Sequence, residues 1–475
     1  MQNLSSRKPI KQGGMGFGIS GWRLARAVSI LGQYGTVSGV ALEILMAEML
    51  RRGDPGEHYR RALSHFPFPQ VAEEVLDAFY VKDGVSADTH SRSTPVWSIM
   101  PSHLLIGATI CANYATVWLA KEGHDYEVGI NYLQKIEMPQ IACTLGAMLA
   151  GVDFITMGAG IPIGIPELMN AIIEGKTVSY RVQVIGKNVT GHTMNFDPQA
   201  FFGDKLPEIK RPEFIPIIAS NLLASIFMDR RRLPEGSVQG FVIEEPTAGG
   251  HNAPPRKPVL NELGEPLPIY GEKDVVNYEK IAGLGLPFWI GGGYASPEKL
   301  KWAQTVGAEG IQAGSIFALC EESGMRLDIK NKLRSLGFSG KLQVTTNMRI
   351  SPTGFPFKVA VLEGSISERA VYEERERVCD RGVLSTLYER PDGSIGYRCP
   401  SEPTLRFIAK GGGEEETKGR GCICNGLVAT AGLNEDEAPV VTLGDDVSFL
   451  PHLMQDENSS YTAKDAVAYL LQAHS

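Results

Sequence analysis

The sequence predicts an α/β protein built on a (β/α)8 TIM barrel, with a helical insertion after the second strand and a C-terminal extension. Over the first 330 residues, short β-rich runs alternate with helical stretches, the runs number eight, and the loops between them are marked by glycine or proline. Apolar strands separated by amphipathic helices indicate parallel pairing through βα crossovers. Eight such units over this length are typical of the barrel.

The eight expected strands follow one another from residue 9 to residue 314. In chain order they are Pro9–Gly13, Gly35–Gly39, Val128–Tyr132, Val152–Thr156, Phe214–Ser220, Val238–Glu244, Leu286–Gly292 and Gly310–Gly314. The helical patterns between them include GWRLARAVSIL, IACTLGAMLAG, IPELMNAIIEG and SPEKLKWAQTVG. Their apolar spacing is that of helices packed on one face.

Two stretches fall outside the eight units. Residues from about 48 to 107 are mostly helical and lie between the second and third strands, and residues 178–198 form a β-rich excursion before the fifth. Insertions after barrel strands lie at the catalytic face, so both are candidate lids or pocket walls. Packing on the outer surface or an oligomer contact is the alternative. We expect a barrel domain over residues 1–330 and an extension over 331–475, where PDG between β-prone flanks is a hairpin signal.

Composition and charge limit the class of protein. The 475 residues are 43% hydrophobic and 21% charged, which is ordinary for a soluble globular chain. The net charge of −8 argues against nucleic acid or an anionic membrane as the main partner. No apolar run approaches the length that spans a bilayer, and no secretory signal begins the sequence. Seven cysteines in such a chain indicate reduced thiols, so we expect a cytoplasmic protein, with a homo-oligomer left open.

Two glycine-rich clusters end the seventh and eighth expected strands. They comprise Gly291, Gly292 and Gly293, and Ala313, Gly314 and Ser315. Loops after these two strands bind phosphate in such barrels. Glycine lets backbone N–H groups approach phosphate oxygens, and the serine adds a hydroxyl donor. The sequence therefore predicts a ligand that carries phosphate.

A third cluster follows the first expected strand and narrows the choice of ligand. Glycines at Gly13, Gly14 and Gly16, with Met15 among them, would let the chain pass under a flat ring system. The dinucleotide fingerprint is absent, because no acidic residue follows at the expected distance and no βαβ unit closes early. FMN therefore fits better than NAD.

Several segments resemble the nitronate monooxygenases, formerly called 2-nitropropane dioxygenases, whose barrel the flavin-type enoyl reductases share. From Pro9 to about Cys320 they are PIKQGGMGFGISGWRLARAVSILGQYGTVSG, VGINYLQKI, GVDFITMGAGIP, TAGGHN, PFWIGGGYAS and GAEGIQAGSIF. The resemblance implies FMN across the top of the barrel. Its phosphate would lie at the loops that contain Gly292, Gly293, Gly314 and Ser315. Gly14 and Met15 would lie along the isoalloxazine, and Asn131 would hydrogen-bond the ring or the ribityl chain.

The same resemblance places the catalytic histidine at His251, with Gly250 beside the cofactor. A histidine of near-neutral pKa on a glycine-rich loop is well placed as a general base. It could take a proton from carbon next to a nitro group or orient an anionic nitronate. The alternative is a loop histidine that bonds only backbone. The chain departs from the family at Thr247, often acidic there, at Ile316, often basic, and in NAPPR after the histidine, so the substrate could differ.

Four of the seven cysteines lie in the expected extension. They are Cys379, Cys399, Cys422 and Cys424. Four thiolates could bind zinc tetrahedrally or hold an iron–sulfur cluster, although the spacing is not that of paired CxxC motifs. The alternative is a set of reduced thiols in a closing flap. The other three, Cys111, Cys143 and Cys320, stand in apolar contexts and are expected in the core.

Taken together, these patterns predict an FMN-dependent oxidoreductase. It would oxidise a nitronate, a nitroalkane or a related small acidic-carbon substrate, with O2 reoxidising the flavin. One alternative is a flavin-dependent enoyl reductase acting on carrier- or CoA-bound chains. Another is a flavin- or metal-binding partner protein with little turnover. Reduction of the flavin by NAD(P)H rather than by substrate would separate the first two.

Overall fold

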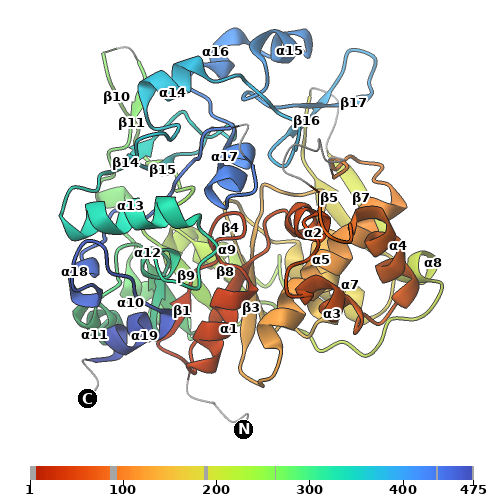
Figure 1. Cartoon of the computed structure of the whole chain (residues 1–475), viewed down its shortest axis with the longest axis horizontal. Helices are drawn as coiled ribbons and strands as arrows, with labels where there is room; N and C mark the ends of the chain where they lie inside the picture. The colour runs from red at the N-terminus through yellow and green to blue at the C-terminus, as the bar shows by residue number, and fades with distance from the viewer. Residues whose placement is uncertain (1–6, 86–93, 187–190, 263, 435–436, 473–475) are drawn as a thin grey trace.

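A closed parallel barrel organises the computed structural model, which describes residues 7–85, 94–186, 191–262, 264–434 and 437–472 (Figure 1). Within these residues the barrel strands are β1 (Ile10–Gln12), β2 (Gly35–Ser38), β3 (Val128–Leu133), β4 (Phe154–Gly158), β8 (Glu213–Ile218), β9 (Phe241–Glu244), β12 (Phe288–Gly291) and β13 (Gly310–Ala313). Each pairs in parallel with its neighbours, β13 pairs with β1, and a bridge from Lys11 to Tyr34 closes the ring. The predicted (β/α)8 fold is confirmed, because every one of these strands overlaps its expected range.

Helices follow the strands and cover the outside of the barrel. They are α1 (Trp22–Ile30), α6 (Gln140–Leu149), α7 (Ile165–Ile173), α9 (Asn221–Met228), α10 (Tyr278–Ala282), α11 (Pro297–Thr305), α12 (Ser315–Ala318) and α13 (Leu327–Phe338). Local sequence explains several of their starts. The Ser220 and Ser296 hydroxyls accept from the N–H groups of Leu223 and Lys299, which satisfies donors that a helix N-terminus leaves free.

The helical insertion after the second strand is also confirmed. It comprises α2 (Leu42–Arg51), α3 (His58–Leu63), α4 (Pro69–Phe79) and α5 (His103–Lys121). By length and composition α5 could cross a membrane, so the expectation that no such run exists was wrong. However, 78% of its most apolar window is buried inside the protein, where it packs against α2, α4 and α6. That burial is typical of a core helix rather than of a lipid-facing one.

Short strands outside the barrel sheet lie in the connections between its later strands. The antiparallel pair β5 (Val178–Val182) and β7 (His192–Phe196) lies in the expected excursion, with β6 (Val184–Ile185) beside it. Residues 187–190 of that excursion lie outside the described residues. The remaining elements here are α8 (Pro198–Phe202), β10 (Val259–Leu260), β11 (Pro266–Leu267) and the 3-10 helix η1 (Glu272–Asp274).

The C-terminal extension covers one end of the barrel and then returns along its side (Figure 1). Its elements are β14 (Val344–Asn347), β15 (Phe357–Ala360), α14 (Arg369–Glu374), β16 (Thr386–Glu389), β17 (Ile395–Arg398), α15 (Thr404–Ala409), α16 (Glu414–Thr417), α17 (Ile423–Thr430), α18 (Leu450–Leu453) and α19 (Ala463–Leu471). The hairpin predicted at PDG is confirmed by the antiparallel pairing of β16 with β17. Residue 330 lies within α13, and α19 packs on α1 and α11. The domain boundaries stay predictions.

Side chains fill the lower part of the barrel. Tyr34, Phe154, Ile215, Val242 and Trp289 form one buried cluster there. Trp289 therefore packs in the core of the barrel, and the Lys11 ammonium lies 3.3 Å from the centre of the Phe154 ring. The upper end of the barrel, where the strands finish, contains a cavity.

Candidate functional site

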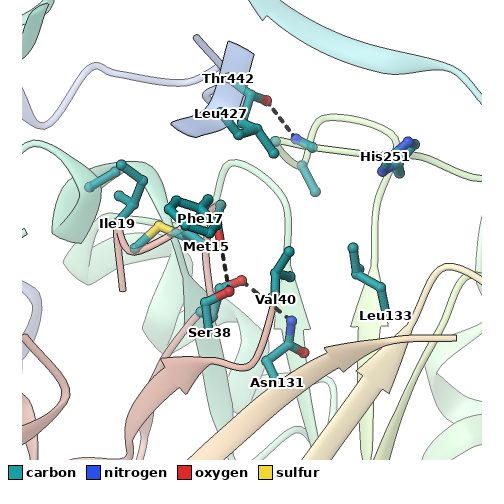
Figure 2. Close-up of a pocket in the computed structure, with 18 of the residues that line it drawn as sticks. Met15, Phe17, Ile19, Ser38, Val40, Asn131, Leu133, His251, Leu427 and Thr442 are labelled. Atoms are coloured by element: carbon teal, nitrogen blue, oxygen red, sulfur yellow. Dashed lines mark hydrogen bonds between the residues drawn. The ribbon is translucent and has the colours of Figure 1, made fainter. Parts of the chain in front are cut away.

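One cavity of about 230 Å³ opens where the barrel strands end (Figure 2). Every residue that the sequence assigned to cofactor binding or catalysis lines it: Gly13, Gly14, Met15, Asn131, Gly250, His251, Gly291, Gly292, Gly293, Ala313, Gly314 and Ser315. The loops after β1, β3, β9, β12 and β13 thus contribute to a single space. The individual roles of these residues remain predictions.

Asn131 is held by contacts that orient its amide. Its Oδ1 accepts from the Thr156 hydroxyl at 2.8 Å, and its Nδ2 lies 3.4 Å from the Gly14 carbonyl oxygen (Figure 2). A Cβ on Gly14 would stand 2.3 Å from the Asn131 Cβ, so this close approach requires glycine. Because the contact with Gly14 is long, the amide N–H groups retain capacity to donate to a ligand in the cavity.

The backbone conformation after β12 requires glycine, independently of any ligand. Gly292 and Gly293 adopt φ values of +110° and +71°, which favour glycine. A Cβ on Gly292 would also lie 2.7 Å from the Glu245 Cβ and 2.9 Å from the Thr247 hydroxyl. The turn therefore needs glycine even without a phosphate beside it.

The first and last barrel strands are joined at the cavity. The Gly13 N–H donates to the Ala313 carbonyl at 2.9 Å, so these two polar groups are already used. A ligand would meet Gly13 and Ala313 through their nonpolar surfaces. Met15 lies against the neighbouring strand end, because a Cβ on Gly314 would be 3.4 Å from its sulfur. This arrangement suits a flat ring better than a charged group.

The candidate phosphate end combines barrel loops with the extension. The Ser315 hydroxyl oxygen accepts from the Gly444 N–H at 2.8 Å, which leaves its own hydrogen to donate. Asp446 also lines the cavity beside Gly293, but the Lys299 ammonium pairs with its carboxylate. The hydroxyl is a donor that fits an anion, whereas the Lys299 ammonium is already bound to Asp446 and to the Gly293 carbonyl. The sequence did not identify Gly444 and Asp446, because more than 120 residues separate them from the loops that they meet.

His251 lies across the cavity from Asn131 (Figure 2). Its Nε2 is 2.7 Å from the Ser351 Oγ, and its ring meets Phe357 edge-on with centroids 4.8 Å apart. Burial, together with the positive charge of Lys135, lowers the pKa of His251 well below its ordinary value. The expected near-neutral pKa was therefore wrong, since both effects disfavour the imidazolium. His251 is neutral at pH 7.

Glu244, the last residue of β9, lines the same cavity and was missed by the sequence analysis. Burial raises the pKa of its carboxyl to about 7, although the nearby Lys135 opposes the rise. A carboxyl with that pKa is close to half ionised at neutral pH, which suits proton transfer. A signal for it existed, because a charged residue ending a barrel strand is placed at the catalytic face.

The extension forms the roof of the cavity. The Thr442 hydroxyl oxygen accepts from the Gly250 N–H at 2.8 Å, and Leu427 lies beside it (Figure 2). Ser351, which meets His251, also belongs to the extension. These contacts fix the loop after β9 from above and limit access to the barrel end.

The structure does not support the predicted metal centre. No group of three or more His, Cys, Asp or Glu side chains in the described residues is arranged to hold an ion. The four cysteine thiols nevertheless lie near one another, because Cys379 interacts with Cys399, Cys422 interacts with Cys424, and Cys424 is also affected by Cys379 and Cys399. The hydrogen bond between the first two thiols lowers the pKa of Cys379 and raises that of Cys399, and the neighbouring Cys422 with burial raises the pKa of Cys424.

The other expectation about cysteines is confirmed. The remaining three, Cys111, Cys143 and Cys320, are buried in the core.

Comparisons with known proteins extend the fold assignment. No family model matches the chain, and no curated protein matches it. Among solved structures, FabK from Thermotoga maritima aligns with 99% of this chain and 93% of its own, at a TM-score of 0.50 and 15% identity. Nitroalkane oxidase from Streptomyces ansochromogenes aligns with 98% of this chain and 96% of its own, at a TM-score of 0.45 and 12% identity. At such identities the similarity to FabK shows a shared barrel fold, and the weaker similarity adds nothing to it.

Proposed function

We propose that this chain is an FMN-dependent oxidoreductase of the nitronate monooxygenase type, which oxidises a nitronate, a nitroalkane or a related acidic-carbon compound with O2. The observation that supports it most is the single cavity at the barrel end. There the Asn131 amide, glycine-rich loops and the side chains of Glu244 and His251 surround one space. The sequence resemblance to that family points to the same chemistry.

The residues around the cavity fit FMN. Asn131 would donate to the ring system, Met15 would lie along it, and the Ser315 hydroxyl would donate to the phosphate. Bound FMN would supply the redox chemistry, taking electrons from the substrate and passing them to O2. The protein supplies position, hydrogen bonds and control of access.

Two side chains divide the proton chemistry in this proposal. Glu244, with a pKa of about 7, takes the proton from the acidic carbon of the substrate. The neutral His251, fixed at Nε2 by Ser351, has Nδ1 to hydrogen-bond the nitro or nitronate oxygens. This assignment makes His251 an orienting residue that contacts substrate, and makes Glu244 the base.

The test is anaerobic flavin reduction with the purified protein. We expect non-covalent FMN that is reduced by nitroalkanes and nitronates and reoxidised by O2. Reduction by NAD(P)H instead would favour the enoyl reductase alternative. A yellow protein that stays oxidised with all of these would favour a partner protein with little turnover. Failure to bind any flavin after reconstitution would contradict the proposal altogether.

A further inference from the structure

A second cavity, of about 290 Å³, adjoins the first behind a shared wall. The wall residues common to both are Ala41, Ile44, Leu133, Ile136, Arg381, Val383 and Leu384. One water needs only about 10–15 Å³ of such space. The second cavity therefore has room for an organic molecule, and nothing in the proposed flavin chemistry uses it.

Polar atoms without partners gather around this second cavity. Four of its lining residues have a buried side-chain atom with no hydrogen-bond partner among the described residues: Glu43 Oε2, Trp97 Nε1, Lys135 Nζ and Gln140 Oε1. The Glu43 and Gln140 side chains are almost fully buried. A buried polar group without a partner is costly, and native proteins satisfy nearly all of them. Two of the four, Trp97 Nε1 and Lys135 Nζ, are donors from which an anionic ligand could accept.

The charges around the cavity favour an anion. Lys135 and Arg381 form no ion pair within the described part of the chain, and the Lys135 ammonium lies 3.6 Å from the centre of the Phe355 ring. Burial lowers the pKa of Lys135 to about 7, and a bound anion would restore its charge. Burial raises the pKa of Glu43 to about 7 and also raises that of Glu137, so these carboxyls oppose an anion less than ordinary ones would.

The rest of the lining is largely nonpolar. Tyr132, Met138, Phe355 and Leu387 form part of the cavity wall. A bare inorganic ion would leave these surfaces without contacts, whereas a short hydrocarbon chain would cover them. The ligand therefore needs an anionic end and an apolar body.

We propose that this second cavity binds a small organic anion, a carboxylate with a short apolar chain, through Lys135 and Arg381. Lys135 also lies between the two cavities, because its charge acts on Glu244 and His251 in the first. The site is independent of the proposed function, since its occupation requires neither flavin nor turnover.

Hexanoate is the probe, and isothermal titration calorimetry on the purified full-length protein measures its affinity. Lys135→Met should weaken hexanoate binding about tenfold or more, because the variant removes a charge-assisted hydrogen bond. Lys135→Arg should keep most of the affinity. Lys301→Met, which removes an exposed lysine on α11, is the matched control and should bind as the wild type does. Hexan-1-ol, which has the same chain without the charge, should bind far more weakly than hexanoate.

Three outcomes would overturn the proposal. Wild-type protein could show no binding of hexanoate at millimolar concentration, which would mean a cavity that holds only water. Hexanoate could bind Lys135→Met and wild type equally. Finally, binding could be lost in His251→Asn but kept in Lys135→Met, which would place the carboxylate in the first cavity.

Discussion

Replacing Glu244 by glutamine should remove the pH dependence of substrate deprotonation. Glutamine keeps the size of the side chain at the end of β9 but cannot accept a proton near neutral pH. General-base participation is typically worth about 10²–10⁴-fold in rate. Flavin reduction by a neutral nitroalkane should fall by that order, whereas reduction by a preformed nitronate, already deprotonated, should change much less.

The size of the pH effect follows from the pKa of about 7 for Glu244. About 1% of such a carboxyl is ionised at pH 5 and about 99% at pH 9, so the wild-type rate constant should rise about 100-fold over this range. With its ordinary pKa of 4.5 the carboxyl would be mostly ionised by pH 5.5, and the profile above that would be nearly flat. The rate constant should rise with pH rather than fall, because only the ionised carboxylate accepts a proton.

Anaerobic stopped-flow measurements with freshly dissolved nitroalkane, from pH 5 to pH 9, test this reasoning. Lys135→Met should move the midpoint upward, because the lysine charge favours the carboxylate. A flat wild-type profile would refute the assignment of Glu244 as the base. A rise that persists in Glu244→Gln would transfer the role to another group, whichever substrate form is used.

Three further changes test other parts of the site and the fold. Gly293→Asp should lower FMN content more than Gly293→Asn, because both residues tolerate the φ of +71° but only aspartate adds charge beside Asp446; equal losses in flavin absorbance would indicate strain alone. His251→Asn should slow reduction by nitroalkane and nitronate alike at unchanged FMN content, and a loss confined to nitroalkane would make it the base. Lys330→Met should lower the free energy of unfolding in urea by roughly 3 kcal/mol, because the Lys330 ammonium donates to three backbone carbonyls. Lys332→Met, at an exposed position, should change the free energy of unfolding little, and equal effects of the two variants would contradict this reasoning.

Much of the barrel was predictable because its signals are local. Each strand is a short apolar run next to glycine or proline. The alternation of strands with helices implies parallel pairing whatever the insertions and the extension contain. At α5 the sequence does contain an apolar run long enough to cross a membrane, contrary to the expectation. Its composition alone cannot distinguish a lipid-facing helix from one covered by α2, α4 and α6, since burial is a property of the neighbours.

Site residues could be predicted from the sequence when a motif at the end of one strand marks them. They could not be predicted when the site depends on segments that are far apart in the chain. The glycine clusters and His251 stand in recognisable loops, and the structure brings them to one cavity. The pKa of His251 depends on its burial and on Lys135, more than 100 residues away, which no local pattern reveals. Similarly, the proximity of the four extension cysteine thiols depends on where their loops fold.

Two of the three departures from the nitronate monooxygenase pattern, Thr247 and Ile316, lie under the extension. The Thr247 carbonyl accepts from the Asp445 N–H at 3.0 Å, and the Ile316 carbonyl accepts from the Tyr461 hydroxyl at 2.7 Å. Ile316 is fully buried, so a basic side chain there would be a charge without water around it. The burial of Ile316 therefore explains an apolar residue there, whereas the contact at Thr247 is made by the backbone and does not depend on the side chain.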